Sequence, residues 1–245
     1  MLKIIVSALL LSLSQLGYAD CTSLTDNVSK VLAYPNNEFF DCKIDPVDTN
    51  KTIVALAHSQ ENNASLYNLD VLLVEINNGK IVQHLFQEGA FESDAVAFSG
   101  ITIDTARYKL APELRAFGIR ANFESNSRMY ALYTKTISLY VSQDQKLKQV
   151  LANLIMYDYA NSFSNGDDEC SPTIIYDTKS ETKRTLAIAK TTSHGYADLL
   201  LQEKTTNNES KMVKNKCVVA TTKTTKKYTL HFNGDVYVVP DALRY

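Results

Sequence analysis

The stretch that decides the fold class is Asn68–Phe86, which reads NLDVLLVEINNGKIVQHLF. Within it, two runs of β-branched and aliphatic residues flank the polar segment Asn77–Lys80. That segment contains an Asn-Gly pair, and both residues of such a pair tolerate the positive φ angles of a tight hairpin turn. We therefore predict an antiparallel hairpin whose strands are Asn68–Ile76 and Ile81–Phe86.

The remainder of the chain carries the same kind of signal. A second Asn-Gly pair, Asn233-Gly234, predicts a hairpin into Val236–Val239, and Pro240 ends that strand. Further runs predict strands at Thr52–Ala57, Ala95–Ile103, Arg115–Phe123, Tyr130–Val141, Thr173–Asp177, Arg184–Ala189, Ala197–Glu203, Val218–Thr222 and Tyr228–Phe232. Parallel sheets would need crossover helices, which the sequence does not suggest. We therefore expect a mainly β fold of antiparallel sheets made from repeated hairpins, arranged either as a propeller-like meander or as a sandwich.

Four segments depart from this pattern. Ser23–Leu32 predicts one short N-terminal helix, because a suitable N-cap precedes apolar residues at every fourth position. Lys146–Met156 fits a helical stripe as well as it fits a strand. The most polar interior break is Asn161–Cys170, and Thr205–Lys216 is the longest predicted exposed loop.

Residues 1–19 are typical of a secretory signal. Lys3 gives a positive start, Ile4–Leu13 is an apolar run broken only by two serines, and the small residues Gly17 and Ala19 suit cleavage after Ala19. The apolar run is too short to span a bilayer. We expect a periplasmic or secreted protein without a membrane span, in which residues 20–245 form a single mainly β domain.

The cysteines agree with export. Four of them, Cys21, Cys42, Cys170 and Cys217, predict two disulfides in an oxidising compartment. Three pairings are possible, and we favour Cys21–Cys42 with Cys170–Cys217, because each pair falls within one local region. The spacing contains no C-x-x-C or C-x-x-H motif, so we expect no metal site at the cysteines.

Composition and glycine spacing exclude several classes of protein. The chain has 245 residues, is 45% hydrophobic and carries a formal charge of −2, which describes a folded globular protein rather than a disordered one. No two of its 8 glycines lie closer than ten positions apart, so G-x-G-x-x-G, P-loop and G-x-S-x-G motifs are absent. We expect no nucleotide or other cofactor.

No arrangement of side chains predicts a catalytic centre. None of the four histidines, His58, His84, His194 and His231, lies in an H-E-x-x-H or H-x-H motif. The adjacent carboxylates Asp167-Asp168-Glu169 are most simply a solvated loop, since three neighbouring side chains cannot all point at one substrate. We therefore assign no catalytic residue.

One group of charged residues is a candidate binding site. Asp104 and Arg107 would face opposite sides of an extended strand, so a local pair between them requires a bend after Asp104. Together with Arg115 and Arg120 they could form an arginine-rich recognition face. The alternative is a structural salt bridge, or a buried aspartate that caps a turn.

Charge is distributed unevenly along the chain. Residues 20–104 hold 13 acidic and 4 basic side chains, and residues 105–245 hold 14 acidic and 20 basic ones. Lys204–Lys227 contains seven lysines and one glutamate. We interpret this segment as a solvated edge hairpin that resists edge-to-edge pairing, with contact to an acidic partner as the alternative. Nucleic acid is not expected as a partner, because the segment lacks arginine and interleaved aromatic residues.

Two parts of the sequence resemble known families. Gly195–Leu199, followed by Tyr228–Tyr237, resembles an FG-GAP-type propeller blade, in which a Gly-x-x-Asp-Leu step opens a strand. The chain also resembles a family of exported bacterial proteins without assigned function, through Asp94-Ala95, Ile101–Tyr108, Arg115–Gly118 and the same Gly195–Leu199 step. Calcium is not expected in the blade-like segment, because its ligand positions hold Lys190, Thr192 and His194.

These observations lead to one functional hypothesis and two alternatives. We expect an exported, non-enzymatic binding protein that meets another exported protein, of which a periplasmic inhibitor or an immunity-type partner is an example. The alternatives are a periplasmic hydrolase that acts through carboxylates, at Asp104 or at Asp167-Asp168-Glu169, and an envelope-associated structural protein.

Overall fold

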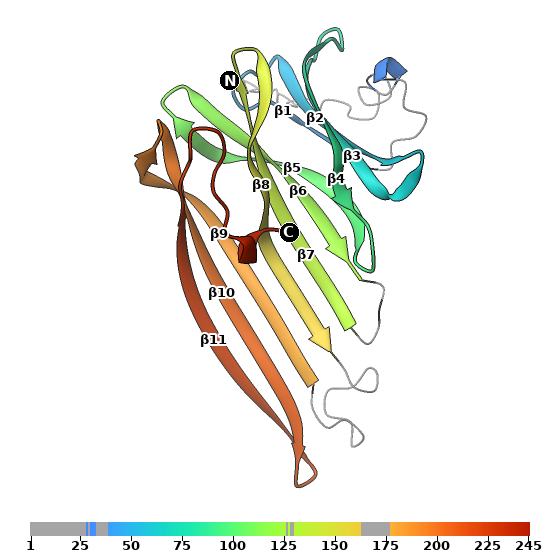
Figure 1. Ribbon diagram of the computed structural model, residues 1–245, viewed down its shortest axis with the longest axis vertical. Coiled ribbons are helices and arrows are strands. Elements are labelled where there is room, and N and C mark those ends of the chain that lie inside the picture. The colour runs from blue at the N-terminus through green and yellow to red at the C-terminus, as the bar shows by residue number, and fades with distance from the viewer. Residues whose placement is uncertain (1–27, 29, 33–38, 126, 128–129, 163–176) are drawn as a thin grey trace, which may run out of the picture.

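The computed structural model describes residues 28, 30–32, 39–125, 127, 130–162 and 177–245. In this part of the chain, eleven strands form two antiparallel sheets, one of four strands and one of seven (Figure 1). The expected mainly β class is confirmed. Of the two arrangements left open, the packing of one sheet against another fits the sandwich.

The four-stranded sheet contains the hairpin that decided the fold class. Its strands follow one another in chain order and are β1 (Phe39–Ile44), β2 (Lys51–Gln60), β3 (Asn63–Glu75) and β4 (Ile81–Glu92). Gly79 has a φ of +71°, and Asn78 accepts a hydrogen bond from the Lys80 N–H (2.8 Å). The predicted hairpin is thus confirmed, although only the glycine of the Asn-Gly pair has a positive φ.

The seven-stranded sheet is also a simple meander. Its strands are β5 (Ala97–Ala111), β6 (Leu114–Glu124), β7 (Tyr130–Gln143), β8 (Lys146–Ser162), β9 (Asp177–Ser193), β10 (Tyr196–Val213) and β11 (Lys216–Leu230). The ambiguous segment Lys146–Met156 lies in β8 and is therefore a strand. Each strand pairs with its neighbour in the sequence, so the order of the sheet requires no crossover between strands.

The two sheets pack around β5. Ile53 and Val71 of the small sheet share a buried cluster with Ile103 and Phe117 of the large one. Where β1 crosses β5, the Ile103 N–H donates to the Asp41 carboxylate (2.7 Å). The crossing is therefore tied by a polar contact in addition to apolar packing.

The C-terminal segment folds back across the seven-stranded sheet. Asn233-Gly234 forms the expected turn, with the Asn233 N–H donating to the Val236 carbonyl (3.0 Å). The expected strand Val236–Val239 is not formed, since only an isolated bridge pairs Phe232 with Tyr237. Tyr237 then lies in a second core, the buried cluster between the seven-stranded sheet and the C-terminal segment. Its N–H donates to the Val150 carbonyl (2.8 Å) and its hydroxyl donates to the Ala197 carbonyl (2.6 Å). The short 3₁₀ helix η1 (Asp241–Leu243) follows and buries Leu243.

The expectation of a loop at Thr205–Lys216 is wrong. Thr205 to Val213 continues β10, and the turn lies at Lys214-Asn215, whose φ angles are +48° and +60°. The threonine-rich sequence favours strand, and an Asn in the second turn position accepts a positive φ. In Figure 1 this long β10–β11 hairpin runs far beyond the small sheet. As expected, β11 is an edge strand, and its residues from Lys216 to Lys227 are all exposed.

Several sequence expectations fall wholly or partly outside the described residues. The signal at 1–19, most of the Asn161–Cys170 break and most of the strand at Thr173–Asp177 are among them. Of the expected helix, Val28 and Lys30–Leu32 are helical. Neither Cys42 nor Cys217 is a free thiol, but Cys21 and Cys170 lie outside the described part, so the two disulfide pairings stay predictions.

Candidate functional site

The structure brings together three of the four residues that the sequence singled out. The register between β5 and β6 shifts after Asp104, which is the bend that a local pair required. The partner of Asp104, however, is Arg120, whose Nη2 lies 2.6 Å from Oδ2. Arg115 donates to the Thr105 carbonyl (2.6 Å), and Arg107 is exposed on the surface.

The Asp104 carboxylate is occupied by local contacts. It accepts hydrogen bonds from the Ala106 N–H (2.9 Å) and the Tyr108 hydroxyl (3.0 Å) in addition to those from Arg120. Burial raises the pKa of Asp104, but these hydrogen bonds outweigh it, so the pKa lies below its ordinary value. An ionised, fully coordinated carboxylate of this kind supports the bulge in β5 and is poorly suited to act as a general acid.

Two histidines share one buried carboxylate in the small sheet. The side chain of Asp70 on β3 is 0% exposed, with His58 of β2 at 3.3 Å and His84 of β4 at 2.5 Å. The group links three neighbouring strands. Within the part of the chain that the structure describes, no group of three or more His, Cys, Asp or Glu side chains could hold a metal ion.

A second His–Asp pair resembles a serine triad but lacks its geometry. His231 Nδ1 lies 3.0 Å from the Asp198 carboxylate and 3.2 Å from the Ser193 hydroxyl. A catalytic histidine uses one ring nitrogen for the carboxylate and the other for the nucleophile, whereas here both contacts fall on the same nitrogen. The arrangement joins β10 to the segment after β11, since Asp198 comes from one and His231 from the other.

The two faces of the seven-stranded sheet differ in chemistry along strands β7–β11. We call inner face the side of β7–β11 that continues from the buried residues Leu199 and Leu201, and outer face the opposite side. Side chains alternate along a strand and aligned residues share a face, so the register assigns every position in this region.

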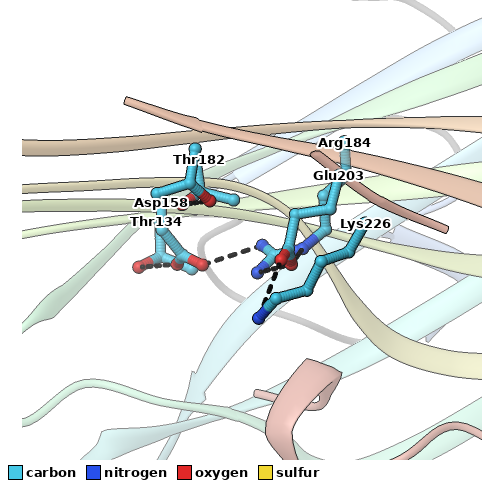
Figure 2. Close-up of polar contacts among 7 residues, drawn as sticks. Thr134, Asp158, Thr182, Arg184, Glu203 and Lys226 are labelled. Atoms are coloured by element: carbon cyan, nitrogen blue, oxygen red, sulfur yellow. Dashed lines mark hydrogen bonds and ion pairs between the residues drawn. The ribbon is translucent and has the colours of Figure 1, made fainter. Parts of the chain in front are cut away.

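The charges of the inner face are largely paired with one another. Figure 2 shows Arg184 reaching both Asp158 (2.8 Å) and Glu203 (2.8 Å), with Lys226 on the far side of Glu203 (3.8 Å). The side chains of Arg184 and Glu203 are only 7% and 8% exposed. Thr134 donates to Asp158 (3.2 Å) and completes a row that crosses five strands. This network links β7–β11 and pairs both of its cations with carboxylates.

The outer face carries an excess of lysine. Beyond Leu200, toward the Lys214-Asn215 turn, its described charged side chains in β7–β11 are Lys135, Lys179, Lys183, Lys204, Lys223, Lys227 and Glu181. The corresponding residues of the inner face are Arg184, Lys211, Lys216, Lys226, Asp158, Glu203 and Glu209. Six cations thus oppose one carboxylate on the outer face, whereas four oppose three on the inner face.

Three tyrosines lie among these lysines. Tyr133 and Tyr157 pack edge to face with ring centroids 5.7 Å apart, and Tyr157 donates to the Glu181 carboxylate (3.1 Å). Burial and the neighbouring Glu181 raise the pKa of Tyr157 to about 12, so its hydroxyl stays a hydrogen-bond donor at neutral pH. We call this region, Tyr133, Tyr157 and Tyr159 with the six lysines and Glu181, the tyrosine–lysine face.

Two ammonium groups of the face rest on its aromatic rings. Lys135 Nζ lies 5.2 Å from the centroid of the Tyr133 ring, and Lys179 Nζ lies 5.5 Å from that of Tyr159. Such contacts hold the long side chains against the sheet and reduce the freedom that binding would otherwise remove.

A shallow hollow adjoins the tyrosine–lysine face. Its lining on the outer side consists of Thr185, Ala187, Leu200, Gln202, Lys227 and Thr229. Leu200 is exposed at its floor, and the aligned pair Lys183 and Lys204 lies one step further along the strands. Polar, apolar and cationic groups therefore follow one another on the same open surface.

The sequence analysis identified the lysines but not the tyrosines beside them. Lys204–Lys227 was expected to lack aromatic neighbours, and in the sequence it does. The register of β7, β8 and β9 supplies them, because Tyr157 aligns with Lys183, and Lys183 aligns with Lys204. The alternation of Tyr133 with Lys135, and of Tyr157 with Tyr159, is the signal that could have indicated this face.

Comparison with known proteins identifies no relative, because no family model, curated protein or solved structure matches this chain. Among the described residues, no helix is long and apolar enough to cross a membrane.

Proposed function

We propose that this chain is an exported, non-enzymatic binding protein that presents the tyrosine–lysine face to an acidic partner. The observation that carries this proposal is the difference in charge between the inner and outer faces of β7–β11. On the inner face, Arg184 and Lys226 are matched by Asp158 and Glu203. On the outer face beyond Leu200, the six described lysines have one described carboxylate between them, Glu181, which pairs with Lys183 (2.8 Å).

The cost of holding these lysines together supports a role in recognition. Like charges on adjacent positions repel one another and destabilise a sheet by a few tenths of a kcal/mol to about 1 kcal/mol each. Lys183 and Lys204 are directly aligned on neighbouring strands, where opposite charges would be more stable. A bound polyanion would remove this repulsion and release counterions from the face.

The geometry of the other candidate groups favours binding over hydrolysis. The Asp104 carboxylate is fully coordinated by Ala106, Tyr108 and Arg120. Ser193 and Asp198 meet the same nitrogen of His231. Asp167-Asp168-Glu169, the other carboxylates proposed for a hydrolase, lie outside the described residues.

Lysine footprinting tests the proposal directly. The purified protein is acetylated with a limiting amine reagent, alone or with an excess of polyglutamate, polygalacturonate, dextran sulfate or (dT)20, and each lysine is quantified by mass spectrometry. We expect at least one of these acidic polymers to protect Lys183, Lys204 and Lys223. Lys211, Lys214 and Lys216, equally exposed on the same hairpin, serve as the internal control. Equal protection of both sets by every polymer, or protection of neither set, would contradict the proposed function.

A further inference from the structure

We propose that the partner of the tyrosine–lysine face is a linear acidic polysaccharide, carboxylated or sulfated, that lies across strands β8–β11. This inference rests on the proposed function and names the class of ligand. It follows from the spacing of the lysines, from the side chains between them and from the state of the tyrosine rings.

The lysines lie at short spacings on the outer face. Alternate residues of a strand are about 7 Å apart and neighbouring strands about 4.8 Å apart, so Lys183 and Lys204 lie about 5 Å apart at their Cα atoms. Lys179 and Lys183, four residues apart on β9, are separated by about 13 Å. Cations repeated at such intervals on a flat surface match a polymer whose charges repeat at short intervals.

The side chains between the lysines can bind hydroxyl groups. Thr206 aligns with Lys223, Thr225 with Lys204 and Asn208 with Lys179, so hydroxyls and amides alternate with ammonium groups across the outer face. These groups both donate and accept hydrogen bonds, as the hydroxyls of a sugar do. The hollow at Ala187 and Leu200 offers a small apolar surface to the carbon face of a sugar ring.

An acidic protein fits this face less well. The centres of protein interfaces are depleted in lysine and enriched in large apolar and aromatic anchors. Here the exposed apolar residues of the face are few, and Leu200 is the largest in the hollow. Lysine also keeps its hydration shell more tightly than arginine does, which suits contacts with a hydrated polymer.

Single-stranded nucleic acid fits less well for a different reason. Proteins that bind it stack bases on open aromatic rings. The ring of Tyr133 is contacted by Lys135 and by Tyr157, and the ring of Tyr159 is contacted by Lys179. The rings of Tyr133 and Tyr159 are therefore partly covered by ammonium groups, which leaves them less open to stacked bases.

The test measures affinity for defined polymers. Binding of the purified protein to polygalacturonate, dextran sulfate, neutral dextran, polyglutamate and (dT)20 is measured by titration calorimetry at two salt concentrations. We expect the two acidic polysaccharides to bind most tightly, with affinity that falls as salt rises. The polygalacturonate and dextran sulfate arms distinguish a carboxylated from a sulfated ligand.

Two sets of variants locate the site. K183Q/K204Q/K223Q is expected to lose about tenfold or more in affinity for the acidic polysaccharide. The control K211Q/K214Q/K216Q removes the same number of charges from the inner side and turn of the same hairpin and is expected to change affinity by less than about twofold. Glu181→Gln, which removes the one carboxylate, is expected to strengthen binding by about two- to threefold. A gain of this kind cannot result from misfolding.

The inference would be overturned by tighter binding of polyglutamate or (dT)20, by equal binding of neutral dextran, or by equal effects of the two triple variants. Tighter binding of polyglutamate or (dT)20 at the same lysines would leave the proposed function intact and change only the ligand class. Failure of every acidic polymer to protect the face in footprinting would remove both proposals.

Discussion

Arg184 is the residue on which the inner-face network depends. Its guanidinium bridges Asp158 and Glu203, and it is shielded from water almost completely. Arginine suits this position because its planar fork of donors can bond two carboxylates at once while always remaining charged. A lysine would supply the positive charge but not the planar set of N–H donors that bonds two carboxylates at once.

Replacing Arg184 by methionine is expected to destabilise the protein by about 3 kcal/mol, because buried Glu203 then keeps only the more distant Lys226 as a cation. The double variant Arg184→Met/Glu203→Met should recover most of this loss, since it removes the buried carboxylate as well. Lys226→Met, which removes an exposed lysine 3.8 Å from Glu203, should cost less than about 0.5 kcal/mol. Urea unfolding followed by far-ultraviolet circular dichroism measures all three, as the chain has no tryptophan. An unchanged midpoint in the single variant would show that the network contributes nothing to stability.

At the scale of the element, the sequence predicted strands better than their ends. Asn78-Gly79 and Asn233-Gly234 could be recognised because an Asn-Gly pair favours a turn, although in both pairs only the glycine has a positive φ. Lys214-Asn215 was missed, since lysine at a positive φ is uncommon and only the register of the hairpin reveals it. Turns of this kind are set by the pairing of the strands, which a single sequence does not state.

The candidate site shows the same limit. Asp104 and Arg120 could be chosen from the sequence as chemically interesting, but the pairing of Arg120 rather than Arg107 with Asp104 depends on how β6 aligns with β5. The tyrosine–lysine face depends on three registers in succession. A shift of one residue between β8 and β9 would place Tyr157 and Lys183 on opposite faces.

The Lys214-Asn215 turn should limit the stability of the distal hairpin. Lys214 holds a φ of +48°, which costs a non-glycine residue of the order of 1 kcal/mol and costs asparagine less. We expect Lys214→Asn to slow amide hydrogen exchange along Lys216–Lys227, and Asn215→Val to accelerate it, because a β-branched residue tolerates positive φ poorly. Exchange at Leu199 and Leu201, in the core, should be unchanged in both variants. Identical exchange of the hairpin in all three proteins would show that the turn does not limit it.

At the scale of the whole molecule, the C-terminal segment closes the second core. The segment crosses from β10 to β8, and Tyr237 bonds both strands, through its hydroxyl to Ala197 and through its N–H to Val150. Phe232, Val239 and Leu243 pack beside it. The segment thereby fixes the base from which the long β9–β11 strands extend, and so the orientation of the tyrosine–lysine face.

Tyr237 should make this closure sensitive to alkaline pH. Burial raises the pKa of its hydroxyl above the ordinary tyrosine value, so the folded protein holds the phenol proton more tightly than the unfolded chain does. The resulting stability is complete below about pH 10, the ordinary pKa of tyrosine, and is lost as pH rises above it. At about pH 7, Tyr237→Phe should be less stable by about 1 kcal/mol, because the Ala197 carbonyl loses its donor.

Above about pH 10 the difference between the two proteins should shrink and then reverse, because only the wild type must keep the Tyr237 phenol protonated in order to fold. Other buried tyrosines, such as Tyr108, are present in both proteins and cancel in the comparison. Tyr130→Phe, at a residue that is 58% exposed, serves as the control and should follow the wild type at every pH. Urea midpoints measured between about pH 7 and pH 11 decide the matter. A difference that stays constant over this range would mean that Tyr237 ionises as readily in the folded protein as in the unfolded chain. The burial of Tyr237 would then not make the protein sensitive to alkaline pH.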